Sequence, residues 1–320
     1  MTIKHVVSVS SGKDSDSTLL IALDRFDKKN VIPIFCDTGN EHEEVYRHLD
    51  YLELALDIKI TRLKASFDER IKHKRMFIAR DQRIGRDKSG KKLRWSNKSK
   101  RRALAFLMPT GNPYLDLCMW KGRFPSRKAQ FCTEELKTNL AVTFQLDLAD
   151  QGFTVVSWQG IRRDESLKRK DALMFERIAP SMYIYRPIVE WTAAMTFESI
   201  AAHGLVPNAL YKQGMGRVGC MPCINARKAE ISEIAKRFPL HMKRIEIWEW
   251  YVMMCSKRQV ATFFPALEIK NFLNKQQAAK DHGIWSVVEW AKTTRGGKQY
   301  DLLAEVEDTH ACSSSYGLCE

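Results

Sequence analysis

Hydrophobic and polar positions along the first half of the chain alternate in blocks that predict strands separated by helices. Short, mostly apolar runs occupy residues 5–10, 31–36, 57–63 and 153–160. Each run is typical of a strand buried in a parallel sheet, and the apolar residues between the first two runs follow helical spacing. Strands that alternate with helical segments predict an α/β fold with a doubly wound, mostly parallel sheet.

From Ile224 onward the pattern becomes mainly helical. Residues 225–238 and 241–255 carry apolar side chains at roughly i, i+3, i+4 and i+7, which is typical of helices packed against a core. We therefore expect a sheet domain over residues 1–223 and a helical cap with a cysteine-bearing tail over residues 224–320. Four tryptophans of this second part are expected to be buried rather than stacked on nucleic-acid bases: Trp248, Trp250, Trp285 and Trp290.

Composition excludes several classes of protein. The chain has 320 residues, of which 44% are hydrophobic, so it can bury a sizeable core. No apolar run approaches the length of a membrane span, and the N-terminus lacks the apolar core of a secretory signal. We expect a cytoplasmic protein with no membrane partner. In that reducing compartment the eight cysteines are expected to be free thiols, metal ligands or catalytic groups rather than disulfides.

Most of the net charge of +14 lies in one segment. Residues 70–102 hold 15 lysines and arginines against two aspartates. This basic insertion also contains Phe77, Trp95 and glycines suited to a mobile loop. A solvated surface would explain an ordinary run of charge, but 33 residues of this density favour a polyanionic partner, and we expect nucleic acid. Contacts with phosphates do not distinguish DNA from RNA.

The turn after the first strand, Ser10 to Ser15, is suited to bind an anion. Gly12 lets the backbone approach a ligand, and the hydroxyls of Ser10, Ser11 and Ser15 add donors. The amides and the positive dipole end of the following helix favour phosphate or pyrophosphate. The stretch lacks the second glycine of a Walker A loop. A capping turn without a ligand is the alternative, since serine and aspartate are common N-caps.

Two further turns at strand ends strengthen the nucleotide interpretation. Asp37-Thr38-Gly39 follows the second strand, and Gly160 follows the fourth. Ligands of doubly wound sheets bind at the carboxyl ends of the strands. The three turns together therefore predict one nucleotide site, which a capping turn alone would not explain.

Several motifs, in order along the chain, resemble one family. The turn SSGKDS resembles the PP-loop of adenine nucleotide α hydrolases, with Ser11 where most members carry glycine. The blocks FCDTGNEHEEVYRHLDYL, FCTEELK, GIRRDESLKR and the stretch from RPIVEW to GCMPC resemble those of the phosphoadenosine phosphosulfate (PAPS) reductase-like family. The resemblance covers roughly residues 5–230, with the basic segment as an insertion, and it implies a PP-loop α/β fold.

The resemblance also implies roles for individual residues. The loop would bind the phosphate- or sulfate-bearing end of an adenine nucleotide, either ATP with Mg²⁺ or PAPS. Arg162, which alone would suggest a surface ion pair, would clamp the anion, since a guanidinium holds two oxygens at once. Lys13 and Lys137 would neutralise pyrophosphate, and Asp14 would help to hold Mg²⁺. The residues expected to bind the nucleotide are Ser10, Ser11, Gly12, Lys13, Asp14, Ser15, Asp37, Thr38, Gly39, Lys137, Gly160, Arg162, Glu165 and Ser166.

Paired cysteines indicate a metal centre. Cys220 and Cys223 have C-x-x-C spacing, and Cys312 and Cys319 lie near the end of the chain. Four thiolates suit an iron-sulfur cluster or zinc, and the ligand count does not separate the two. Cys132 is a further candidate ligand, because the resemblance aligns its block with one in which cluster-binding reductases carry cysteines. A free redox dithiol at the C-x-x-C pair is the alternative.

The resemblance leaves two enzyme reactions open. In the first, the chain is an ATP pyrophosphatase that adenylates an acceptor, expected to be nucleic acid, for attack by sulfur from a donor protein. This resembles the ATP pyrophosphatase subunit of DNA phosphorothioation systems and the PP-loop enzymes that thiolate tRNA. We favour this reaction, with Lys13, Asp14 and Arg162 as the catalytic residues.

In the second reaction, a low-pKa thiolate attacks PAPS at sulfur, and sulfite leaves after reduction by a thioredoxin-like protein. Cys319 would be that catalytic nucleophile. Its surroundings, YGLCE, lack the histidine that follows this cysteine in the reductases, which argues against this reaction. A zinc-stabilised nucleic-acid-binding protein without catalysis is a third class.

Overall fold

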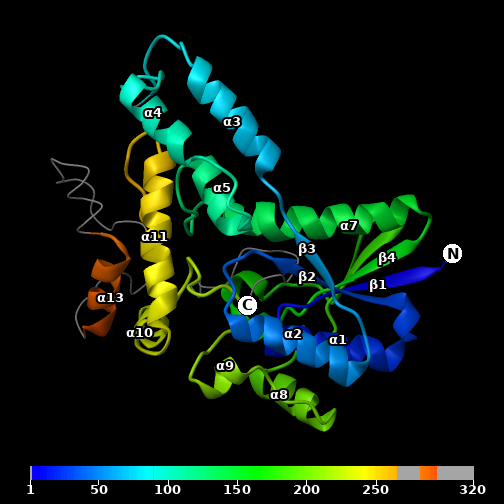
Figure 1. Ribbon diagram of the computed structural model, residues 1–320. Coiled ribbons are helices and arrows are strands. Elements are labelled where there is room, and N and C mark those ends of the chain that lie inside the picture. Colours follow the sequence, from blue (N-terminus) through cyan, green and yellow to red (C-terminus); the bar gives the residue numbers. More distant parts are fainter. Residues whose placement is uncertain (1, 89, 265–281, 294–320) are drawn as a thin grey trace.

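The structure, a computed structural model, describes residues 2–88, 90–264 and 282–293 of the chain. At its centre lies a six-stranded sheet with the order β3-β2-β1-β4-β6-β5 (Figure 1). Neighbouring strands run parallel, except for β5 and β6, which pair antiparallel. The strands are β1 (Ile3–Ser8), β2 (Val31–Asp37), β3 (Thr61–Lys64), β4 (Thr154–Trp158), β5 (Phe175–Ala179) and β6 (Met182–Tyr185).

Helices cover both faces of this sheet. α1 (Lys13–Arg25) and α2 (Glu43–Leu56) lie on one face, and α7 (Asn139–Asp150) lies on the other (Figure 1). Because the side chains of a strand alternate between faces, Val7 of β1 joins the large core cluster, whereas Val6 packs in a smaller cluster with residues of α7. The predicted doubly wound, mostly parallel sheet is confirmed.

Two strand assignments differ from the sequence pattern. The third strand begins at Thr61 rather than at Asp57, because Asp57 ends α2 in the left-handed conformation with φ of 50°. The hairpin of β5 and β6 is missing from the sequence-based prediction. β5 is an edge strand on which Glu176 and Arg177 interrupt the apolar residues, so it lacks the apolar run of a buried strand.

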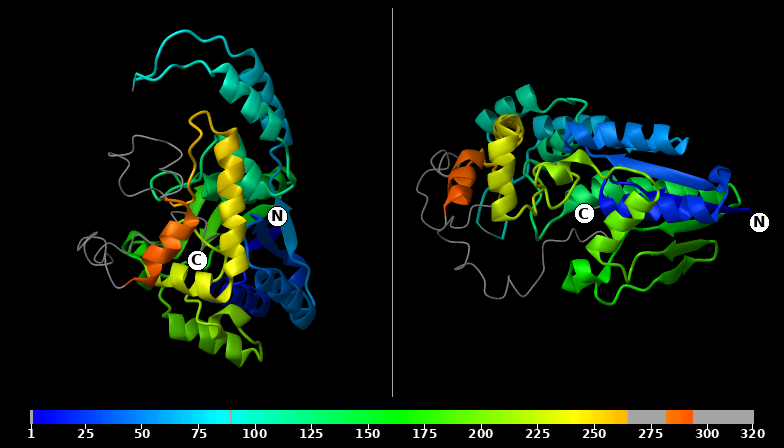
Figure 2. Two further views of the ribbon diagram at one scale, coloured as in Figure 1. Left: turned by 60° about the vertical axis from the view of Figure 1, so that its left-hand side comes forward. Right: turned by 90° about the horizontal axis from the view of Figure 1, so that it is seen from below.

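The basic segment is a helical hairpin: it begins and ends in helices that the expectation of a loop did not include, and residues 81–88 and 90–96 between these helices lie outside any helix. α3 (Asp68–Arg80) leads away from the sheet and α4 (Asn97–Phe106) returns (Figure 1, Figure 2). Arg75 of α3 donates to the carbonyl oxygens of Leu104 at 2.7 Å and Leu107 at 2.8 Å. Part of the positive charge therefore ties the two helices together rather than facing a partner.

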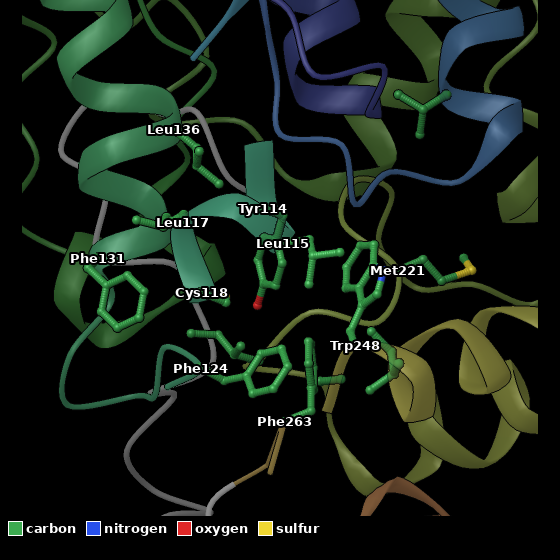
Figure 3. Packing of buried hydrophobic residues seen from close by; sticks show 14 of the residues in the cluster. Tyr114, Leu115, Leu117, Cys118, Phe124, Phe131, Leu136, Met221, Trp248 and Phe263 are labelled. Carbon is green, nitrogen blue, oxygen red and sulfur yellow. The ribbon is translucent and has the colours of Figure 1, made fainter. Parts of the chain in front are cut away.

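Three helices form the cap, in which the middle one, α11, packs against α4 and α5 (Pro113–Lys121), and the other two pack against α11. The three helices are α10 (Lys228–Arg237), α11 (Pro239–Cys255) and α13 (Ile284–Lys292). Figure 3 shows Tyr114 of α5 against Trp248 of α11 and Phe263, with ring centroids 5.6 and 6.1 Å from that of Tyr114. This aromatic contact belongs to the same core cluster as β1 and α1, so the helical part shares its core with the sheet.

Aromatic residues of the basic and helical segments differ in exposure. Trp95 and Trp248 are buried, whereas Trp250 and Trp285 are 43% and 39% exposed. Trp290 is half-buried against the core. The expectation of burial therefore holds fully for Trp248, partly for Trp290, and not for Trp250 and Trp285. The remaining helices are α6 (Phe131–Thr133), a π-helical turn (Glu134–Thr138), α8 (Ala193–Ala202) and α9 (Ala209–Lys212). In the described part of the chain, no helix has the length and apolar character needed to cross a membrane.

Candidate functional site

The turn between β1 and α1 is held in shape by its own serine hydroxyls. Ser15 Oγ donates to Gly12 O at 2.8 Å and accepts from the amides of Ser10 and Gly12 at 3.1 and 3.2 Å. Ser11 is fully buried with a left-handed φ of 68°, and its hydroxyl accepts from Asn208 Nδ2 at 2.9 Å. A residue other than glycine is strained in this conformation, and the hydrogen bond stabilises it. The hydroxyls of Ser11 and Ser15 thus serve the loop itself.

Three charged side chains meet where α1 begins. Arg162 Nε donates to Asp14 Oδ1 at 2.8 Å, and Lys13 Nζ lies 3.4 Å from Asp14 Oδ2. The Asp14 and Arg162 side chains are only 1% and 5% exposed. Burial lowers the pKa of Arg162, but the charge and hydrogen bond of Asp14, together with the charges of Asp164 and Glu165, outweigh burial and raise this pKa above its usual range. The structure therefore brings together the predicted catalytic residues Lys13, Asp14 and Arg162.

Gly160 permits this contact between the loop after β4 and the start of α1. A Cβ atom at this position would lie 2.9 Å from the backbone C and O of Asp14 and 3.1 Å from Ser15 N. Such distances are shorter than van der Waals contact, so any side chain would push β4 and α1 apart. The absence of a side chain at Gly160 thus allows the backbone after β4 to lie against the backbone at the start of α1.

The loop after β2 lies between the PP-loop and the C-x-x-C segment. Asp37 Oδ1 accepts from the amide of Gly39 at 2.9 Å, and Thr38 Oγ1 donates to Glu41 Oε1 at 2.6 Å. Thr38 Oγ1 also lies 3.5 Å from Cys220 Sγ, while Glu41 and Cys220 form a β-bridge. Burial raises the pKa of Glu41. This loop therefore connects the nucleotide side of the site with the C-x-x-C segment.

Hydrogen bonds fasten the C-x-x-C segment to the same loop. Met221 N donates to Asn40 O at 2.8 Å, and Asn40 Nδ2 donates to Pro222 O at 3.0 Å. Arg244 of α11 donates to Asn40 Oδ1 at 3.2 Å and to Met221 O at 2.9 Å. Residues from the sheet, the C-x-x-C segment and the cap thus form one network.

An open cleft of about 540 Å³ adjoins the PP-loop. Lys13, Arg162, Asp164 and Glu165 line one part of it, and residues 214–217 line another. Arg162 also pairs with Asp164, and Glu165 pairs with Arg169. The cleft joins two predicted blocks, the PP-loop and the Gly-x-Arg-x-x-Glu-Ser block, at the carboxyl ends of β1 and β4. A nucleotide bound here would meet both cations and the first amides of α1.

Two of the residues predicted to bind the nucleotide, Ser166 and Lys137, do not line the cleft. Ser166 is buried, and its hydroxyl has no hydrogen-bond partner within the described residues. Lys137 lies in the π-helical turn Glu134–Thr138 and lines a separate pocket with Thr38 and Ser10. Such π-helical turns are frequent at functional sites. Binding of nucleotide by these two residues stays a prediction.

That separate pocket, of about 30 Å³, contains three cysteines. Cys132, Cys220 and Cys223 line it together with Tyr114 and Lys137. Burial raises the pKa of Cys132 and of Cys220 to about 12. The structure therefore brings Cys132 next to the C-x-x-C pair, as one of the predicted sets requires.

The remaining predicted cysteines, Cys312 and Cys319, lie outside the described residues. Their part in a metal centre, and the part of Cys319 in catalysis, stay predictions. Within the described chain the cysteine pocket supplies three thiols rather than four.

Four further residues shape the site without a signal in the sequence pattern. Arg217 and Asn225 line both the cleft and the cysteine pocket, so they separate the two. The hydroxyl of Tyr211 accepts the amide hydrogen of Lys13 at 2.9 Å. Glu41, described above, touches Cys220. Arg217 and Tyr211 both lie in the stretch from RPIVEW to GCMPC that resembles the family. Their roles could not be predicted from it, because their contacts depend on distant parts of the chain.

Comparison with known proteins agrees with this arrangement. The model of the phosphoadenosine phosphosulfate reductase domain matches residues 4–226. An uncharacterized 37.8 kDa protein of Escherichia phage 186 is 43% identical and covers 99% of this chain and 96% of its own. An uncharacterized protein of Methanocaldococcus jannaschii, MJ0066, is 27% identical over 76% of this chain and 40% of its own.

A solved structure is also similar to this chain. It is a PAPS reductase from Candida auris in complex with phosphate, with a TM-score of 0.42 and 12% identity. The match covers 70% of this chain and 83% of that one. The family model spans more than two thirds of the chain, from β1 through the C-x-x-C segment. The chain therefore belongs to the phosphoadenosine phosphosulfate reductase domain family.

Proposed function

We propose that this chain is a PP-loop ATP pyrophosphatase that adenylates an acceptor, a nucleic acid, for sulfur transfer. The observation that carries the proposal is the Lys13, Asp14 and Arg162 cluster in the wall of the cleft. Two cations held by one buried carboxylate suit a polyphosphate with several negative charges. The amide end of α1 adds further attraction for phosphate.

The proposed reaction has two steps. An acceptor oxygen attacks the α-phosphorus of ATP, the bond from that phosphorus to the bridging oxygen breaks, and pyrophosphate leaves with the electron pair. A sulfur nucleophile from a donor protein then attacks the carbon or phosphorus atom that carries the adenylated oxygen, the bond from this atom to that oxygen breaks, and AMP leaves with the oxygen. Negative charge grows on pyrophosphate in the first step, so positioned cations would stabilise its transition state.

The residues of the cleft have separate tasks in this proposal. Arg162 and Lys13 neutralise the leaving pyrophosphate, and Asp14 orients both of them. Tyr211 releases the amide of Lys13 when a phosphate oxygen takes its place. Mg²⁺ would arrive bound to ATP. The oxygens of Asp14 already pair with Arg162 and Lys13, so Asp164, whose side chain is 46% exposed, is better placed to contact a metal on the phosphates.

The helical hairpin supports nucleic acid as the acceptor. Several of its cations bind the protein itself: Arg75 as above, and Arg102, which donates to the carbonyl oxygens of Met254 at 3.0 Å and Ser256 at 2.6 Å. Other cations are exposed and, within the described residues, have no ion pair or hydrogen bond of the side chain. They are Arg80, Lys88, Lys91, Lys92, Arg94, Lys98 and Arg101. Clustered cations of this kind suit the phosphate backbone.

The sulfonucleotide reductase alternative needs an accessible thiolate of low pKa. Burial raises the pKa of Cys36, Cys132, Cys220 and Cys255 to about 12, so these thiols stay protonated at neutral pH. Cys319, which lies outside the described residues, stays the predicted nucleophile of the reductase reaction. This supports adenylation as the first choice, with the reductase as the second.

A metal at the cysteine pocket is a further part of the proposal. Thiol sulfurs are the donors that iron-sulfur clusters and zinc prefer, and Lys137 and Arg217 beside them would balance the charge of thiolates. A pocket of about 30 Å³ has room for one small guest such as a water or a single ion. A cluster would require the walls to move and a fourth ligand from residues 294–320, and no step of the proposed reaction depends on it.

The test is pyrophosphate release from Mg-ATP by protein purified without oxygen, with DNA, with RNA, and with neither. We expect release that rises with one nucleic acid and falls at least about 100-fold in Lys13→Ala. Lys59→Ala, an exposed lysine away from the cleft, is the matched control. Release that persists in Lys13→Ala would contradict the proposal. If release is absent under all conditions while PAPS and a thiol donor yield sulfite, the reductase is correct.

A further inference from the structure

A second group of potential ligands lies outside the cleft and outside the cysteine pocket. One ligand atom each from His42, Glu43 and His241 all lie within 4.8 Å of one another. We propose that these three side chains bind a divalent transition metal of the zinc class and that the metal joins α2 to α11.

The three residues come from two helix starts that are far apart in the sequence. His42 is the N-cap of α2 and Glu43 its first residue, whereas His241 lies in the first turn of α11. The imidazole rings of the two histidines stack, with centroids 4.8 Å apart and an interplanar angle of 18°. Phe238 packs edge-on against His42, with centroids 4.5 Å apart. Packing by the surrounding chain therefore holds the rings together, and a metal would not have to assemble them.

The distances between the ligand atoms are close to those of a metal site. Glu43 Oε2 lies 3.2 Å from His241 Nε2 and 3.8 Å from His42 Nδ1. Ligands that stand about 2.1 Å from a tetrahedral zinc ion are about 3.4 Å from one another. Because the two rings are nearly parallel and their nitrogen lone pairs lie in the ring planes, one imidazole would have to turn for both nitrogens to point at the same ion.

The chemical state of the ligands also suits a metal. His42 and His241 are only 8% and 7% exposed. Neutral imidazole is the form that binds metals. Two imidazoles and one carboxylate form a common zinc ligand set that leaves a position for water, and the exposed side of Glu43 gives water access.

Charged side chains around His42 affect how well a cation would bind there. Two are arginines, which disfavour it, and two are glutamates, which favour it. The positive charges of Arg47 and Arg244 lower the pKa of His42, while Glu43 and Glu44 raise it. Arg47 pairs with Glu44, and Arg244 is turned toward Asn40 and Met221 by the hydrogen bonds given above. His42 Nδ1 accepts from the amide of Glu44 at 3.0 Å, so coordination through this atom would replace one capping hydrogen bond. The alternative is a hydrogen-bonded trio without a metal.

A metal here would fix the position of α11. Arg244 stands three residues after His241, in the next turn of the same helix, and it contacts the loop after β2 and the C-x-x-C segment. Metal binding would therefore hold the network of Asn40, Met221 and Arg244 in place. This inference is independent of the reaction proposed above.

The experiment measures zinc bound to chelator-treated full-length protein, by mass spectrometry of the metal and by titration with Zn²⁺. We expect His241→Ala and His42→Ala each to lose one equivalent of zinc or to bind it about 100-fold more weakly. His73→Ala, an exposed histidine of α3, is the matched control and should bind as the wild type does. The zinc-induced rise in Tm should also disappear in His241→Ala.

Cobalt separates this site from the cysteine pocket. Co²⁺ bound by thiolates shows charge-transfer absorption from sulfur, whereas Co²⁺ bound by two imidazoles and a carboxylate does not. We expect His241→Ala to remove the cobalt absorption that lacks this sulfur band, and Cys223→Ser to leave it in place. Equal zinc content and affinity in the wild type and His241→Ala would overturn the proposal, as would a wild type that binds no zinc. Comparable Tm values without metal would show that the variants fold.

Discussion

The nucleotide cleft and the interior beside the cap both contain buried titratable groups. The cleft stabilises their charged forms, whereas the interior favours the neutral form. In the cleft, Arg162 and Asp14 are almost completely buried but face each other at 2.8 Å. In the interior, burial raises the pKa of Glu249 to about 7, and its oxygens accept hydrogen bonds from backbone amides rather than from a cation. Burial with a counter-charge preserves charge for a ligand, whereas burial without one favours the neutral form.

The largest effect is expected when the counter-charge in the cleft is removed. Arg162→Ala removes the guanidinium that faces the buried carboxylate of Asp14 and takes a cation from the phosphate site. We expect the rate of pyrophosphate release to fall about 100- to 1,000-fold. Steady-state kinetics of Arg162→Ala and Arg162→Lys measure this. A decrease of less than about tenfold in Arg162→Ala would show that the buried pair is structural.

The next effect tests the interior, through Glu249 of α11. Its oxygens accept from the amides of Phe263 at 2.7 Å and Ile284 at 3.0 Å. Because the folded pKa of about 7 exceeds the ordinary value of 4.5, the folded state binds more protons between these values. The free energy of unfolding should therefore fall as pH rises from about 4.5 to about 7, by at most about 3 kcal/mol.

Denaturant unfolding of the wild type and Glu249→Gln from pH 5 to pH 8 measures this dependence. Glutamine cannot ionise, so the variant should lose that slope. Glu246→Gln is the matched control, because Glu246 is exposed on the same helix and Lys243 pairs with it. Parallel curves for the wild type and Glu249→Gln would mean that Glu249 titrates normally.

A smaller effect is expected from the backbone contact that builds the cleft. In Gly160→Ala the new Cβ would lie 2.9 Å from the backbone of Asp14. We expect a decrease of about 1–3 kcal/mol in the free energy of unfolding, together with weaker nucleotide binding. Gly216→Ala serves as the control for stability, since its Cβ would meet no atom within 4 Å. Equal stabilities of the two variants would show that β4 and α1 separate without cost.

The smallest effect concerns charges that are neither buried nor paired. Replacement of Lys91, Lys92 and Arg94 by alanine should weaken nucleic-acid binding by about tenfold at moderate salt. The slope of log K against log salt should decrease by up to about 0.9 for each phosphate that the variant no longer neutralises. Binding measured by fluorescence anisotropy at several salt concentrations, with Lys59→Ala as control, tests this. An unchanged slope would exclude the hairpin tip from the interface.

Local patterns predicted the parts of the site that depend on neighbouring residues. The PP-loop, the turn after β2 and the turn at Gly160 each follow a strand that is recognisable in the sequence. The sequence also indicated that Lys13, Asp14 and Arg162 would share a site, through resemblance to a family. The contact itself joins residues 148 positions apart, and no periodicity contains that information.

The errors have physical causes as well. The basic segment looked like a loop because its charges hide two helices, in which Arg75 and Arg102 bond carbonyl oxygens at helix ends. The edge strand β5 lacks a buried face and therefore lacks a strand pattern. Tyr211 and Arg217 gave no signal, because their contacts arise only when distant blocks of the chain come together.

The network of Asn40, Met221 and Arg244 has a consequence for slow fluctuations. Met221 donates its amide to Asn40, and Arg244 bonds both residues, so the loop after β2 cannot open alone. Segments that share their hydrogen bonds open as one cooperative unit. The amide hydrogen of Met221 should therefore exchange with solvent deuterium only when α11 detaches its first turns. The N-terminal end of this cap helix would then govern how often the nucleotide loop and the cysteines are exposed to solvent.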